Sequence, residues 1–156
     1  MLANVSSTYT EIVTIVFSST IAAKSWLATV AVVLAVLQVL TAARIYGRLK
    51  RFIPLPYRVV ARTHRYSGRL ALLFTLPVIF HCVFILGFQT TTTRTLVHSI
   101  AGSFVYGVFA AKVIFIRSRA YPGWVLPVAG GTLFATLSTL WLTSAYWYFT
   151  QVRFGF

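Results

Sequence analysis

The chain has 156 residues, of which 58% are hydrophobic and only 10% are charged, and its mean hydropathy is +0.83. A soluble domain of this length carries about a quarter charged residues, so this chain lacks the polar surface that a water-soluble fold needs. The formal net charge is +13 with Glu11 as the single acid, but most of the basic residues lie between two apolar runs, which suits contact with membrane lipid and excludes a nucleic-acid groove.

Four apolar segments are each long enough to cross the hydrocarbon core of a bilayer, which takes about 20 residues. They run over about residues 26–43, 68–88, 96–116 and 124–149. The helix of the second segment is expected to begin near Arg62, and residues 8–24 are expected either to form a short helix on the outer surface or to extend the first span. The predicted fold is an all-α, polytopic membrane four-helix bundle over residues 25–156, preceded by an extracytoplasmic or interfacial segment over residues 1–24.

The connections between these spans differ in basic charge. The third connection holds Arg117 and Arg119, whereas the second holds Arg94 alone. The first connection and its flanks hold eight basic residues: Arg44, Arg48, Lys50, Arg51, Arg58, Arg62, Arg65 and Arg69. By the positive-inside rule the first and third connections are cytoplasmic and both termini lie outside. The predicted location is a cell membrane of the bacterial plasma-membrane kind, crossed several times.

Two histidines fall at one predicted depth on consecutive antiparallel spans. His81 lies seven residues before the outer end of the second span, and His98 lies six residues after the outer start of the third. At 1.5 Å per residue both imidazoles lie about 10 Å inside the outer boundary. Ionisable residues inside a membrane are costly and indicate function by default, and axial ligation of a b-type haem takes one imidazole on each side of the iron. We therefore expect one haem b, with its iron bound by His81 and His98.

Two neighbours of His98 fit the same site. Gly102 lies one turn inward, where a missing side chain would let a porphyrin approach the backbone, and Arg94 lies one turn outward, where it could neutralise a haem propionate. Other interpretations remain open: the two histidines could simply hydrogen-bond neighbouring helices, or His81, Cys82 and His98 could bind a metal ion. Pro77 predicts a kink before His81.

Three segments carry a resemblance to known proteins: His64-Arg65-Tyr66-Ser67-Gly68-Arg69, Pro77-Val78-Ile79-Phe80-His81-Cys82 and His98-Ser99-Ile100-Ala101-Gly102. Over about residues 60–149 the chain resembles small four-helix membrane b-type cytochromes, namely the cytochrome b561 and ferric-reductase-like groups, and an uncharacterised bacterial membrane family associated with them. The resemblance implies single-electron transfer between quinol, soluble carriers and other haems. The b561 proteins bind two haems with four histidines, whereas this chain has three histidines, and no second histidine matches the depth of His64.

The first of these segments also resembles a stretch of succinate dehydrogenase membrane anchors that lines a quinone pocket. That resemblance implies a quinone site at the inner surface, made by His64, Arg65 and Ser67.

The sequence thus predicts an electron-transfer subunit that exchanges electrons with an extracytoplasmic redox partner and with quinone, any catalysis lying in an associated membrane or extracytoplasmic redox subunit. The alternative is a cofactor-free membrane anchor or assembly subunit of a larger respiratory complex. A transporter is disfavoured, because the spans contain no carboxylate and no inverted repeat is evident.

Overall fold

The computed structural model describes residues 2–118 and 120–151, and all the regular secondary structure within these stretches is helical. A short helix, α1 (Leu2–Thr14), precedes α2 (Thr20–Ile45), α3 (Tyr57–Phe80) and α4 (Thr93–Ser118). A π-helical segment, η1 (His81–Leu86), continues α3. The last span consists of α5 (Val125–Trp141), the π-helical η2 (Leu142–Tyr146) and α6 (Trp147–Gln151).

In the part of the chain that the structure describes, four helical stretches are long and apolar enough to cross a membrane: Thr20–Ile45, Tyr57–Leu86, Thr93–Ser118 and Val125–Gln151. They confirm the predicted all-α bundle of four membrane spans. Residues 8–24 divide between the two expectations. Residues up to Thr14 belong to the short helix α1, and residues from Thr20 onward extend the first span. The second span begins at Tyr57, five residues before the predicted Arg62. Arg119 and residues 152–156 of the predicted bundle lie outside the described residues.

Local sequence explains where the spans begin and bend. The Ser19 hydroxyl accepts a hydrogen bond from the Ala22 amide at 3.1 Å and so caps the first turn of α2. Pro56 precedes Tyr57, the first residue of α3, and proline is favoured where an amide donor is not needed. Pro77 lies inside α3, four residues before η1 begins at His81. The helix that carries His81 is therefore irregular at that residue, as the predicted kink requires.

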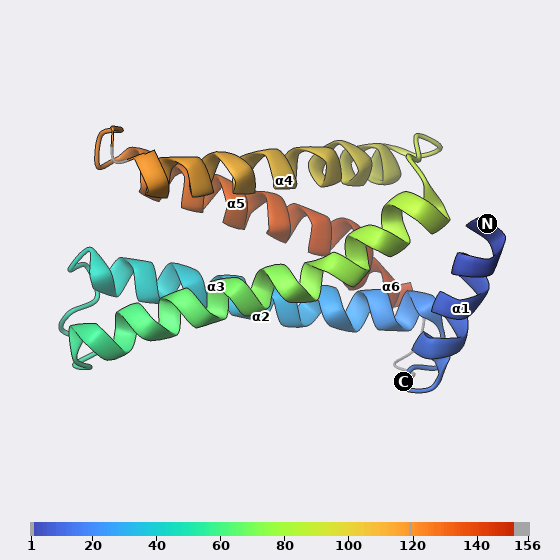
Figure 1. Ribbon diagram of the computed structural model, residues 1–156, viewed down its shortest axis with the longest axis horizontal. Helices are drawn as coiled ribbons and strands as arrows, with labels where there is room; N and C mark the ends of the chain where they lie inside the picture. Colours follow the sequence, from blue (N-terminus) through green and yellow to red (C-terminus); the bar gives the residue numbers. More distant parts are fainter. Residues whose placement is uncertain (1, 119, 152–156) are drawn as a thin grey trace.

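The spans form two pairs (Figure 1). Helix α2 packs closely along α3, and α4 packs along α5, while α2 and α5 join the two pairs. Within the described residues the backbones of α3 and α4 rarely come close, and the Tyr106 hydroxyl of α4 donates a hydrogen bond to the Thr75 carbonyl of α3 at 3.3 Å. Helices α1 and α6 lie at one end of the bundle, here named the outer end after the predicted orientation, and the α2–α3 connection lies at the opposite, inner end.

Small residues form most of the buried core, which permits close approach of the helices without lipid between them. Among the described residues the buried alanines are Ala22, Ala23, Ala31, Ala35, Ala71, Ala129 and Ala145. Large apolar side chains instead face outward on every span, as contact with lipid requires: Val33 on α2, Leu73 on α3, Phe104 on α4 and Val128 on α5 are each more than half exposed.

Candidate functional site

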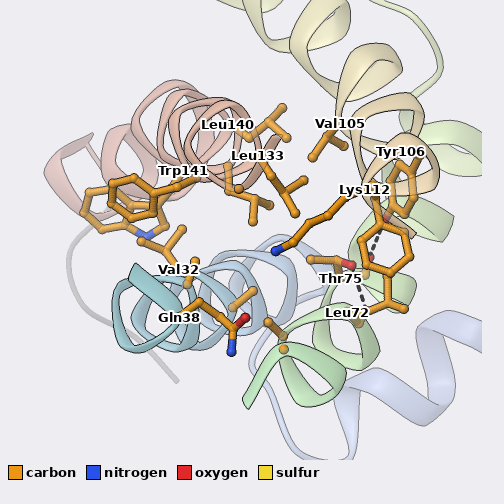
Figure 2. Close-up of a pocket in the computed structure, with 18 of the residues that line it drawn as sticks. Val32, Gln38, Leu72, Thr75, Val105, Tyr106, Lys112, Leu133, Leu140 and Trp141 are labelled. Carbon is orange, nitrogen blue, oxygen red and sulfur yellow. Dashed lines mark hydrogen bonds between the residues drawn. The ribbon is translucent and has the colours of Figure 1, made fainter. Parts of the chain in front are cut away.

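A cavity of about 1330 Å³ lies between the α2–α3 pair and the α4–α5 pair. Figure 2 shows part of its lining, which comes from all four spans and is mostly aliphatic and aromatic. Cys82, His98 and Gly102 line its outer part, and His64, Arg65 and Lys112 line its inner part. The cavity therefore joins two layers of polar groups through an apolar middle.

The imidazole of His98 is oriented by Thr143 of η2. Its Nδ1 lies 3.0 Å from the Thr143 hydroxyl, and that hydroxyl donates its own hydrogen to the Thr139 carbonyl at 2.7 Å. Because the hydroxyl hydrogen is used, the threonine oxygen acts as acceptor and His98 Nδ1 carries the proton. The Nε2 lone pair of His98 is then free, and a hydrogen bond of this kind from the other nitrogen is typical of metal-ligating histidines.

The ring of His81 is buried, with 1% of its surface exposed, and neither of its nitrogens has a hydrogen-bond partner. It lies against α1, with its centroid 5.9 Å from that of Tyr9. Burial, and to a smaller extent the Cys82 side chain, raises the pKa of the Tyr9 phenol above its ordinary value of 10.0. His81 does not line the cavity, so a short helix outside the spans covers this imidazole.

The structure brings Cys82, rather than His81, into direct contact with His98. Cys82 Sγ lies 4.0 Å from His98 Nε2, and His81 is the adjacent residue on the same π-helical turn. A porphyrin between the two histidines would need Cys82 and His98 to move apart. The described residues contain no group of three or more His, Cys, Asp or Glu side chains placed to hold a metal ion, so the alternative metal site of His81, Cys82 and His98 is not formed.

Arg94 is engaged with the end of the last span. It donates a hydrogen bond to the Thr143 carbonyl at 2.7 Å, and its guanidinium carbon lies 4.2 Å from the centroid of the Trp147 ring. These contacts fasten the outer end of α4 to η2 and α6. Gly102 lines the cavity, and a Cβ added there would meet only Leu140, at an ordinary contact distance of 3.8 Å.

Lys24 is a member of the outer layer that the sequence analysis did not single out. It is only 8% exposed, and its charge acts on His81, Cys82 and His98. The available signal was its position, because it follows Ile21-Ala22-Ala23 at the start of an apolar span, where a charged residue is costly.

The inner layer centres on the amide of Gln38. Its Nε2 donates to the His64 carbonyl and, at 2.7 Å, to the Ser67 hydroxyl. His64 Nδ1 lies 2.8 Å from the Thr41 hydroxyl, which donates to the Leu37 carbonyl. His64 is thereby held in the same tautomer as His98, with Nε2 as the acceptor.

The residues predicted for a quinone site separate in the structure. His64 and Arg65 line the cavity, but Ser67 does not, and its hydroxyl donates to the Thr63 carbonyl at 2.7 Å. Ser67 is therefore part of the α2–α3 interface.

A family profile matches residues 3–156, which is nearly the whole chain, and its description reads family of unknown function, DUF6529. The chain belongs to the DUF6529 family. No curated protein and no solved structure matches the chain. Membership of DUF6529 carries no activity with it, so any function must be argued from the two polar layers and the cavity.

Proposed function

We propose that this DUF6529 protein is a b-type cytochrome subunit that holds one haem near the outer ends of α3 and α4, with His81 and His98 as axial ligands. It would pass single electrons to or from an extracytoplasmic redox partner. The chemistry supplied by a bound haem is the uptake and release of one electron at iron.

The observation that carries the proposal is the state of the two imidazoles. His81 is buried with both nitrogens unpartnered, although nearly all buried polar groups in proteins have a partner. The His98 ring contacts the Thr143 hydroxyl through Nδ1 and also hydrogen-bonds the Leu140 carbonyl, whereas the contact of Nε2 with Cys82 is long, at 4.0 Å. Two imidazoles with unused nitrogens on neighbouring turns of the bundle fit a ligand that binds both.

The charge of the outer layer favours haem over a bare metal ion. Lys24 is buried beside both histidines, and the single acid of the chain, Glu11, is on α1. A buried ammonium repels a divalent cation, whereas haem brings two propionates of negative charge. Lys24 is a second candidate partner for a propionate beside Arg94: Lys24 hydrogen-bonds the Cys82 side chain next to both histidines, whereas Arg94 is bound to Thr143 and Trp147.

The loose packing between the two pairs of spans favours the proposal, because a haem macrocycle needs space between its two ligand helices. Among consecutive spans of the described chain, α3 and α4 have the fewest close backbone approaches, with the Tyr106 hydroxyl bonded to the Thr75 carbonyl, and the cavity between the two pairs of spans reaches His98. His81 lies outside that cavity, so a haem bound by both histidines would need the His81 imidazole to turn away from Tyr9. Irregular backbone at Pro77 and η1 lowers the cost of moving Cys82 away from His98. Gly102 lines the cavity without a side chain, so none projects into the cavity at this point.

The test is the visible spectrum of the purified protein, oxidised and reduced with dithionite, for the natural chain and three variants. We expect His81→Gln and His98→Gln each to remove the haem bands, and His64→Gln, the matched control at the inner layer, to keep them. A spectrum that survives His81→Gln but is lost in both other variants would replace His81 by His64 as the ligand. A featureless spectrum in protein made with ample haem would refute the cytochrome proposal.

In that last case the cofactor-free anchor of a respiratory complex would lead. The sparse contact between α3 and α4 favours it independently, since a partner's helix could fill that side of the bundle. Exchange of electrons with quinone, if it occurs at the inner layer, would have to use His64 and Arg65 without Ser67.

A further inference from the structure

Four arginines follow one face of α3 at the inner end. Arg58, Arg62, Arg65 and Arg69 recur every three or four residues, the spacing that places side chains on one side of a helix, and all four are exposed. From the first to the last they rise about 17 Å along the axis. The positive-inside rule concerns basic residues in the loops and near the ends of the spans, whereas this basic stripe continues along the helix itself.

The upper part of this stripe continues into the cavity. Arg65 and Arg69 line its inner part together with Arg48 and Lys112. Figure 2 shows the Lys112 side chain directed inward between the helices, and a Cβ added to Gly130 would lie 3.8 Å from its Nζ. Four cationic side chains therefore line the inner part of one cavity.

No acidic side chain of the protein can balance these charges. The single acid, Glu11, belongs to α1 at the outer end. Within the described part of the chain Lys112 makes no hydrogen bond or ion pair, and it lies about 9 Å before the end of α4. A cation kept in an apolar site without a counter-charge is costly, so an anion from outside the chain is expected.

The rest of the cavity shows what kind of anion fits. Beyond Lys112 its lining becomes apolar and includes Leu72, Val105, Leu133 and Leu140. A free inorganic anion would leave that region unfilled, whereas an acyl chain would occupy it. Basic pockets between spans on the cytoplasmic side are the usual sites for anionic lipid head groups.

We propose that the inner part of the cavity binds an anionic phospholipid, with its phosphate between Lys112, Arg65 and Arg69 and an acyl chain in the apolar part. His64 lines the same region and offers Nε2 as an acceptor for a head-group hydroxyl. The proposed phosphate position lies at the opposite end of the same cavity from His98, so lipid binding can be tested in protein with and without haem.

The experiment is native mass spectrometry of the full chain in detergent, with phosphatidylglycerol or phosphatidylcholine of identical acyl chains added after delipidation. One unpaired cation contributes about 1 kcal/mol to the binding of an anionic lipid, so we expect phosphatidylglycerol to be retained at least about fivefold more than phosphatidylcholine. We expect Lys112→Met to remove most of this preference. Methionine has a similar length and no charge, so the variant needs no rearrangement of the fold.

Two glycine variants separate cavity binding from general lipid contact. Gly131 lines the cavity and Gly107 on α4 does not, yet a Cβ added to either meets nothing within 4 Å. We expect Gly131→Leu to lower retention of phosphatidylglycerol and Gly107→Leu to leave it unchanged.

Equal retention of the two lipids, an unchanged preference in Lys112→Met, or full retention in Gly131→Leu would each overturn the proposal. Displacement of phosphatidylglycerol by millimolar inorganic phosphate would assign the site to a free anion instead. His81→Gln serves as the haem-free control and should retain the lipid as the natural chain does.

Discussion

Replacing His81 by leucine should stabilise the haem-free protein, which is the opposite of what a structural histidine would show. The imidazole is 1% exposed and has two unpartnered nitrogens, and leaving a polar group buried without a partner costs about 1–3 kcal/mol. Leucine has a similar volume, so little cavity energy is added. We expect the free energy of unfolding of haem-free protein to rise by about 1–2 kcal/mol. This is the lower part of the range, because leucine loses the ring contact with Tyr9 and that loss offsets part of the gain.

The assay is unfolding in mixed micelles of increasing dodecyl sulfate content, on protein made with haem synthesis withheld and on protein made with haem. His98→Leu is the matched control: it breaks the bond to Thr143 and should destabilise haem-free protein by about 0.6 kcal/mol, the average for such a bond between spans. With haem supplied, both variants should be less stable than the natural chain, because a ligand that binds only the folded state adds to its stability. If the free energy of unfolding of haem-free His81→Leu instead falls by about 1 kcal/mol or more, the size expected when a buried polar group loses its partner, then His81 has a structural partner and the reasoning is refuted.

Three further outcomes follow from the polar layers. Thr143→Val removes the acceptor that fixes His98 Nδ1 and should weaken haem binding about 10–100-fold, measured by titration of haem into haem-free protein. Gln38→Leu removes two hydrogen bonds between α2 and α3 and should destabilise the bundle by about 1 kcal/mol in the same micelle assay, with no change in any haem spectrum. Arg94→Gln loses the contacts to Thr143 and Trp147 and should increase proteolysis near Gln151, whereas an unchanged cleavage rate would show that these contacts do not hold α6 in place.

The spans were predictable because hydrophobic length is a strong signal, and the structure shifted only their ends. Pro56 explains the earlier start of the second span at Tyr57, since the helix can begin directly after a residue that needs no amide donor. The nature of residues 8–24 was not predictable, because Thr14 and Ser19 interrupt a pattern that is neither clearly apolar nor clearly polar. In the structure the break falls between them, with Ser19 capping the next helix.

The placement of His81 and His98 at one level along the bundle was predictable from 1.5 Å per residue, but the direction of their side chains was not. The π-helical turn at His81 changes the angle between successive residues, so Cys82 faces His98 while His81 faces Tyr9. Neither the turn nor the position of α1 over it leaves a periodic signal in the sequence. The threonine partners were hidden for a related reason, because Thr143 and Thr41 lie on other helices and their pairing depends on register between spans.

His64 and His98 share one local chemistry, yet the packing around them separates their roles. Each has Nδ1 fixed by a threonine and Nε2 free. His64 lies in the α2–α3 interface, where Gln38 binds its carbonyl and a Cβ added to Gly68 would come within 3.0 Å of the Gln38 amide oxygen. A flat cofactor does not fit between α2 and α3 at this point, and on the cavity side His64 has no second histidine at its level. His98 instead faces η1 across α3 and α4, whose backbones rarely come close, and His81 is the next residue to the Cys82 that it contacts, so the proposed ligand of two imidazoles fits the outer layer better than the inner one.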